Sequence, residues 1–172
     1  WPTIRQAIDY LERQGFLYRE HGRGTFVSPQ KLQKGMQELT SFSEDLARRG
    51  IRPGQIIRRI EFLEPTPGIL QRLELPSGTN VLCVDRIRLG DDTPIGLQTS
   101  YLSLDEKQII TREDLENSGS LYRVLQEKFN ILPTEADETL EVTLATPDEA
   151  AALHILPGSP LLLNERLTMF EQ

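Results

Sequence analysis

The sequence has few of the residues on which most metal and catalytic sites depend. It contains one cysteine, Cys83, and two histidines, His21 and His154, among 172 residues. A single cysteine excludes an intramolecular disulfide and argues against a cysteine-based zinc site. The chain also has no P-loop, no Gly-x-Ser-x-Gly pattern and no His-Glu-x-x-His pattern. We therefore expect no metal, no cofactor and no catalytic nucleophile, and we interpret Cys83 as a small core residue.

Long hydrophobic runs are missing as well. No apolar run approaches the roughly 20 residues that a membrane span requires, and the first residues do not resemble a signal peptide. Hydrophobic residues make up 38% of the chain and charged residues 26%, which excludes a disordered, collagen-like or coiled-coil chain. The length fits one domain, or one small and one medium domain. We expect a cytoplasmic protein.

Charge is distributed unevenly along the chain. Residues 1–34 carry a net charge of +3, whereas residues 35–172 carry −10. A basic first segment on an acidic body predicts two units with different partners, of which only the first suits a polyanion such as nucleic acid. The imbalance is also small enough to arise by chance, so composition alone does not decide the matter.

Residues 1–27 are predicted to form a helix followed by a hairpin. Four apolar residues recur at helical spacing: Ile4, Ala7, Ile8 and Leu11. Two short β-prone runs follow, at residues 16–18 and 25–27, and between them Gly22 and Gly24 suit a tight hairpin tip. The polar, proline-containing residues 28–35 are predicted to be a linker.

Residues 36–172 alternate between helical and strand patterns. Ser41 followed by Glu44 is the signature of a capping box and predicts a helix over 41–49 that stops at Gly50. Further helices are predicted over residues 67–73, 119–130 and 147–153. Strands are predicted over residues 54–63, 81–89, 94–102, 136–144 and 161–170. Long strands joined by hairpins and mixed with separate helices predict an α+β fold with an antiparallel sheet.

The first segment carries a signal for DNA binding. A helix followed by a glycine-tipped hairpin is how winged helix-turn-helix domains end, with the helix in the major groove and the hairpin along the DNA backbone or minor groove. The residues expected to meet DNA are Thr3, Arg5, Gln6, Gly22, Arg23 and Gly24. The alternative is a generic helix and hairpin whose arginines are solvated surface charges.

Several stretches of the sequence resemble a known family in the family's order. Those of the first segment are residues 2–11, 15–18 and 22–27, and those of the body are residues 39–46, 84–88, 94–95, 100–101, 120–122 and 160–166. Together they are similar to transcriptional regulators of the GntR family, HutC branch, with a partial winged helix-turn-helix before a UTRA effector-binding domain. The resemblance implies domains at 1–27 and 36–172, joined by the linker at 28–35.

The resemblance implies a ligand-responsive regulator, usually a homodimeric repressor, whose effector domain has a chorismate-lyase-like fold. Its partners would be operator DNA, in the complete protein, and a small anionic effector. In relatives that sense sugar phosphates, two strand arginines, hydroxyls at the start of the capped helix and the serine before Leu-Tyr hold the anion. These correspond to Arg86, Arg88, Ser41 and Ser120.

The residues themselves support such a site. Arg86 and Arg88 are two residues apart on a predicted strand, so they point to the same face, and arginine forks suit phosphate or carboxylate. One of Ser100 and Tyr101, on the neighbouring strand, can face the same pocket. Gln98 is a departure from the pattern that the resemblance implies, because many relatives have a ligand-contacting glutamate there, and the missing charge suggests a different polar pattern in the ligand. The expected effector-binding residues are Ser41, Phe42, Arg86, Arg88, Gln98, Ser100, Tyr101, Ser120 and Tyr122.

Three alternatives stay open from the sequence alone. Arg86 and Arg88 could pair with nearby acidic residues and be purely structural. The body could be an enzyme, because chorismate lyase shares its fold and acts on a carboxylated small molecule. It could also be a dimerisation module without a ligand. The glycine-tipped hairpin at residues 22–27 favours the regulator, because a stand-alone lyase has no use for it.

Overall fold

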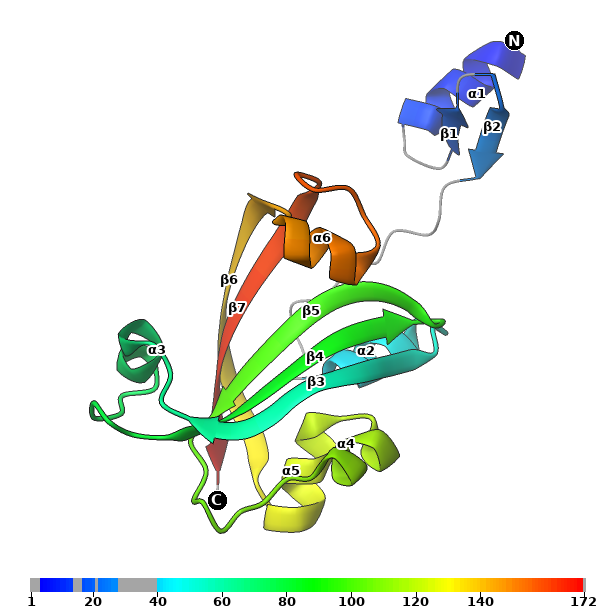
Figure 1. Cartoon of the computed structure of the whole chain (residues 1–172). Helices are drawn as coiled ribbons and strands as arrows, with labels where there is room; N and C mark the ends of the chain where they lie inside the picture. Colours follow the sequence, from blue (N-terminus) through cyan, green and yellow to red (C-terminus); the bar gives the residue numbers. More distant parts are fainter. Residues whose placement is uncertain (1–3, 14–16, 21, 28–39, 172) are drawn as a thin grey trace. The chain divides into compact units, whose positions relative to one another are not determined.

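The computed structural model describes residues 4–13, 17–20, 22–27 and 40–171 (Figure 1). The chain divides into two compact units, residues 1–37 and 38–172. Each unit is described by itself below. The expected linker at 28–35, together with Thr3 and His21, lies outside the described residues.

The first unit is a helix and a hairpin, as the sequence predicts. Helix α1 spans Ile4–Arg13, and strands β1 (Leu17–Glu20) and β2 (Gly24–Val27) pair antiparallel. The rings of Tyr18 and Phe26 stack across the two strands, with centroids 5.6 Å apart. Gly24 at the hairpin tip has a φ of +127°, a conformation that favours glycine.

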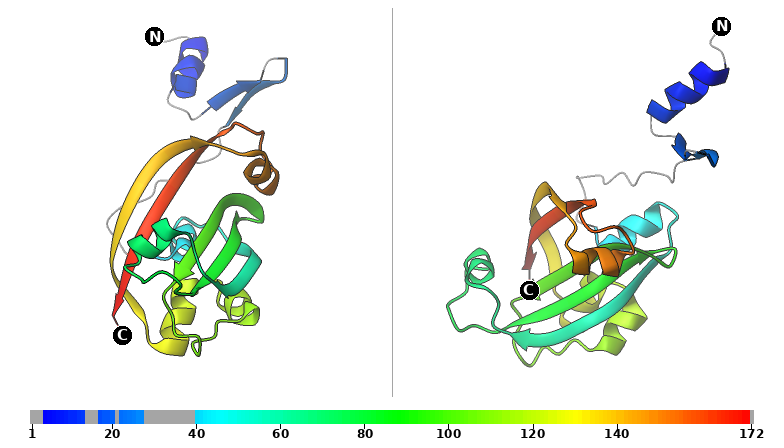
Figure 2. Two further views of the ribbon diagram at one scale, coloured as in Figure 1. Left: turned by 60° about the vertical axis from the view of Figure 1, so that its left-hand side comes forward. Right: turned by 45° about the horizontal axis from the view of Figure 1, so that its top comes forward.

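The second unit contains two antiparallel sheets (Figures 1 and 2). One has three strands in the order β3-β4-β5, and the other is a long two-stranded ribbon of β6 and β7. The strands span Pro53–Leu63 (β3), Val81–Gly90 (β4), Thr93–Leu102 (β5), Leu132–Leu144 (β6) and Pro160–Glu171 (β7). The predicted α+β fold with antiparallel strands is confirmed.

Five helices are described in this unit. They are α2 (Phe42–Arg48), α3 (Pro67–Arg72), α4 (Arg112–Ser118), α5 (Leu121–Phe129) and α6 (Pro147–Leu153). The predicted capping box is present at α2, because Ser41 Oγ accepts from the Glu44 amide at 3.3 Å and the Ser41 amide donates to Glu44 Oε2 at 2.8 Å. The sequence pattern missed α4, which buries only Leu115. Gly119, in the left-handed conformation, separates α4 from α5.

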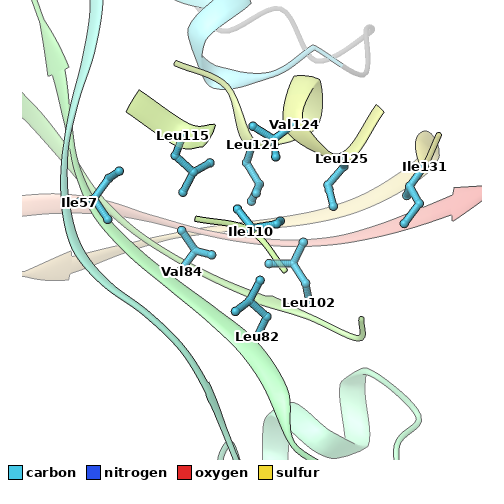
Figure 3. Packing of buried hydrophobic residues seen from close by; sticks show 10 residues of the cluster. All are labelled: Ile57, Leu82, Val84, Leu102, Ile110, Leu115, Leu121, Val124, Leu125 and Ile131. Carbon is cyan, nitrogen blue, oxygen red and sulfur yellow. The ribbon is translucent and has the colours of Figure 1, made fainter. Parts of the chain in front are cut away.

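The hydrophobic core lies between the three-stranded sheet and helices α4 and α5 (Figure 3). From the strands it takes Ile57, Leu82, Val84 and Leu102, and from the helices Leu115, Leu121, Val124 and Leu125, with Ile110 and Ile131. Because side chains alternate along a strand, the face of β4 that carries Leu82 and Val84 also carries residues 86 and 88.

In the part of the chain that the structure describes, no helix is both long and apolar enough to cross a membrane.

Candidate anion-binding site

Two arginines continue the core face of the sheet. Arg86 and Arg88 lie on the central strand β4, and each side chain is only 2% exposed. Arg86 is opposite Ile57 on β3 and Gln98 on β5, whereas Arg88 is opposite Gln55 on β3. Residues directly opposite each other in an antiparallel sheet share a face. The register therefore surrounds the two guanidinium groups with amide side chains.

Neutral oxygens accept the hydrogen bonds of both guanidinium groups. Gln55 Oε1 accepts from Arg86 Nη1 at 3.1 Å and from Arg88 Nη1 at 2.8 Å. Gln98 Oε1 accepts from Arg86 Nη2 at 2.9 Å, and Ser43 Oγ accepts from Arg88 Nη2 at 2.8 Å. Among the described residues, no carboxylate forms an ion pair with either arginine.

The adjacent acidic residue does not neutralise the pair. Asp85 directly precedes Arg86 on β4 and therefore points to the opposite face of the sheet. Its carboxylate pairs with Arg58 Nε at 3.4 Å. The structural alternative, in which acidic neighbours hold Arg86 and Arg88, therefore has no support in the contacts. Two positive charges share a buried site without a counter-charge from the described residues.

This arrangement is electrostatically costly, and within the described part of the chain it leaves two N–H donors without a partner. Burial, and to a smaller extent the positive charge of Arg88, lower the pKa of Arg86 to about 9. Burial also lowers the pKa of Arg88 to about 10. The Nε atoms of both side chains are buried and have no hydrogen-bond partner among the residues that the structure describes. A bound anion would compensate both charges and accept from the unused N–H groups.

Helix α2 and the α4–α5 junction border the two arginines. The ring of Phe42 lies 4.8 Å from the guanidinium carbon of Arg88, a cation–π contact. Ser43 Oγ donates to the carbonyl of Gly119 at 2.6 Å while it accepts from Arg88. Ser120 is buried and caps α5 by accepting from the Arg123 amide at 3.4 Å. The site thus joins β3, β4, β5, α2 and the start of α5.

Comparison with known proteins identifies the family of the second unit. The UTRA domain family matches residues 48–172, which is most of the chain. The chain belongs to the UTRA-domain transcriptional regulators of the GntR family.

Curated relatives of this UTRA regulator are named as transcription regulators. The chain is 33% identical over 170 residues to the HTH-type transcriptional repressor NagR of Bacillus subtilis, covering 98% of this chain and 69% of the relative. It is 33% identical over 174 residues to the HTH-type transcriptional regulator Rv0792c of Mycobacterium tuberculosis, covering 95% and 61%. The chain thus spans about two thirds of the length of these relatives. It is a transcription regulator and not an enzyme.

A solved structure shows the same fold. The crystal structure of PhnF from Mycobacterium smegmatis aligns with a TM-score of 0.72 at 24% identity, covering 98% of this chain and 73% of that one. This likeness, like the UTRA match, agrees with the fold that the resemblance implied.

The structure brings together only some of the residues predicted for the effector site of this UTRA regulator. Gln98 accepts from Arg86 and the ring of Phe42 contacts Arg88, and the two arginines share the acceptor Gln55. Ser41 and Ser120 are buried at the starts of α2 and α5, where their hydroxyls cap the helices.

Two of the predicted residues, Tyr101 and Tyr122, lie away from the arginines, whereas Ser100 lies on their face of the sheet. Tyr101 is opposite Cys83, on the face of the sheet away from Arg86, so the structure does not place it in the cluster. Ser100 is opposite Val84 and is therefore the member of that pair on the arginine face. Tyr122 lies against β7, where its hydroxyl is 3.0 Å from Thr168 Oγ1.

Sequence reasoning missed Gln55 and Ser43, although both contact the arginines. Alternation along the predicted strand 54–63 places Gln55 on the face of Ile57. Its position opposite Arg88 depends on strand register, which the sequence did not reveal. Ser43 could have been found because it follows Ser41 and Phe42 at the start of the same predicted helix.

The residues predicted to meet DNA are in the first unit. Arg5 and Gln6 are exposed on α1, and Gly22, Arg23 and Gly24 are exposed at the hairpin tip. This exposure is what a DNA-reading helix and wing require. Thr3 lies outside the described residues.

Proposed function

We propose that Arg86 and Arg88 bind the anionic group of a small-molecule effector, such as a sugar phosphate. The observation that carries the proposal is the burial of two guanidinium groups that have no carboxylate partner among the described residues. A phosphate monoester suits this site best because its two negative charges match the two arginines. A carboxylate would satisfy half of that charge.

Calorimetric titration and thermal unfolding of this chain test the proposal. Inorganic phosphate and sugar phosphates should bind, and the corresponding neutral sugars should not. A ligand at about 100 times its Kd should stabilise the protein by about 2.7 kcal/mol. Arg86→Met should remove this effect. Arg72→Met, which removes an exposed arginine from α3, is the matched control and should respond like the wild type.

We further propose that effector binding changes operator binding in the complete protein. A ligand can do this only if it favours one arrangement of the protein over another. Arg88 supports such coupling because it donates to Ser43 on α2, the first helix described in the second unit. In the complete protein, Arg86→Ala should abolish the effector response and leave ligand-free operator binding nearly intact.

Helix α1 and the β1–β2 hairpin are proposed to contact the operator. Arg5→Ala should weaken binding of the complete protein to a selected operator fragment by about 1–3 kcal/mol per half-site if Arg5 makes a bidentate base contact. Binding should also fall steeply with salt concentration. An unchanged affinity at fixed salt would contradict the assignment of α1 as the reading helix.

We propose that the protein acts as a homodimer and that the β6–β7 ribbon contributes to the contact. Leu140, Val142, Leu144 and Leu162 are exposed on this ribbon, and the pairing of Val142 with Leu162 places these residues on one face. A two-stranded ribbon gains little stability by itself. In a dimer, the apolar face of each copy's ribbon would be covered by the same face of the other copy. Sedimentation should show a dimer, and Val142→Glu should shift it toward monomer.

A further inference from the structure

Among the described residues, Gln55 is the one side chain that accepts hydrogen bonds from both arginines. Its Oε1 atom accepts from Arg86 at 3.1 Å and from Arg88 at 2.8 Å. Its Nε2 atom donates to the main-chain carbonyl of Leu115, and Leu115 is fully buried in the core. These three contacts fix which way the amide points, because only the oxygen can accept from a guanidinium and only the nitrogen can donate to a carbonyl.

A neutral amide at this position has a consequence that a carboxylate would not have. The two guanidinium groups repel each other, so they need a shared acceptor to stay side by side. A glutamate would supply that acceptor, but it would also cancel one positive charge and leave the Leu115 carbonyl without its donor. Glutamine supplies the acceptor and leaves both charges available.

We propose that Gln55 is the positioning residue of the anion site, holding Arg86 and Arg88 together while preserving the charge of both for the effector. This inference rests on the proposed function of the two arginines. Four of their ten N–H groups are used by Gln55, Gln98 and Ser43. The remaining N–H groups, including both buried Nε atoms, are available to an anion while Gln55 stays in place.

Two substitutions separate the two parts of this role, with inorganic phosphate as the probe. Gln55→Glu should raise the dissociation constant of phosphate roughly tenfold or more, because its carboxylate competes for the guanidinium groups. The same variant should raise the unfolding temperature of the ligand-free chain, because neutralising one of two buried positive charges outweighs the loss of the single hydrogen bond to the Leu115 carbonyl. Gln55→Met removes the acceptor at similar length. It should raise the dissociation constant roughly threefold to tenfold and lower the unfolding temperature.

The opposite signs in Gln55→Glu are the signature of this role, because a residue needed only for folding would lower affinity and stability together. Gln71→Glu, the same chemical change at an exposed position on α3, is the matched control and should bind phosphate like the wild type. If Gln55→Glu does not fold, Gln55→Met decides the question when its phosphate affinity is measured well below its unfolding temperature, with circular dichroism showing a fully folded chain, because a role in folding alone would then leave the affinity at the wild-type value.

The failure of this inference differs from the failure of the proposed function. Unchanged affinity in Gln55→Glu, or unchanged or tighter phosphate binding by Gln55→Met, would overturn the role of Gln55 while Arg86→Met still abolishes binding. A wild-type chain that binds no phosphate, or an Arg86→Met variant that binds it normally, would overturn the anion site and the role of Gln55 with it.

Discussion

Replacing Arg86 with methionine should stabilise the ligand-free protein and abolish its affinity for phosphate. Both effects follow from the burial of a charged side chain that has only neutral acceptors among the described residues. Methionine keeps most of the length and apolar volume of the side chain and removes its charge. Stability and binding should therefore change in opposite directions.

The size of the stabilisation can be worked out from the site. Arginine ordinarily titrates above about pH 12, whereas burial and the charge of Arg88 lower the pKa of Arg86 to about 9. At about 1.4 kcal/mol for each pKa unit, charged Arg86 costs on the order of 4 kcal/mol. The variant also deprives Gln55 and Gln98 of a donor, which costs about 1–3 kcal/mol. We expect a net gain of about 1–3 kcal/mol, the range seen when buried charges are replaced by apolar groups.

The pH dependence of this gain has a definite sign. Because the pKa of Arg86 is lower in the folded chain than in the unfolded chain, the unfolded chain binds more protons above about pH 9. The electrostatic penalty of the wild type is therefore fully present at pH 7 and declines as the pH rises through about 9. The advantage of Arg86→Met should shrink over the same range.

Denaturant unfolding followed by circular dichroism measures the difference, with and without phosphate. Arg72→Met, an exposed site on α3, is the control and should change stability by less than about 0.5 kcal/mol. The reasoning is refuted if Arg86→Met lowers the stability of the ligand-free protein by more than about 1 kcal/mol. Such a loss would mean that the arginine stabilises the fold.

Three further predictions concern the elements around the site. Ser41→Ala removes the hydroxyl of the α2 capping box and should lower the free energy of unfolding by about 1 kcal/mol. An equal loss in Ser41→Thr, which keeps the hydroxyl, would contradict this explanation. Gly119→Ala places a side chain at a φ of +68° with open space around it. The strained backbone conformation alone should therefore lower the free energy of unfolding by about 1–2 kcal/mol. The control Gly68→Ala, in open space without a positive φ, should not destabilise the protein. Hydrogen bonds from Lys128 and from the Thr111 amide lower the pKa of Asp114 to about 2. The stability lost in Asp114→Asn at pH 7 should therefore shrink as the pH falls from about 4 and be mostly gone near pH 2. A difference at pH 2 as large as that at pH 7 would show that the charge is not its source.

The sequence was informative where local chemistry determines structure. Ser41 and Glu44 predicted a capped helix, because their side chains and amides bond within four residues. The alternation of β4 predicted that Arg86 and Arg88 share a face. Helix α4 was missed because it buries a single residue, Leu115, and so has no apolar stripe.

Long-range register limited what could be predicted of the site. Gln55 reaches the arginines only because β3 pairs with β4 in the observed register, which includes an irregularity between Ile57 and Arg59. No local signal fixes that pairing. Tyr101 was grouped with Ser100 because the sequence left open which of the two faces the arginines, and the pairing of Tyr101 with Cys83 places it on the other side.

Arg86 and Arg88 together are proposed to hold an anion. A crystal structure of this chain grown with a sugar phosphate tests that claim most directly. We predict one phosphate group within hydrogen-bond distance of both guanidinium groups, with Gln55 still bonded to them. A phosphate bound elsewhere, with both arginines still satisfied by Gln55, Gln98 and Ser43 alone, would contradict the account.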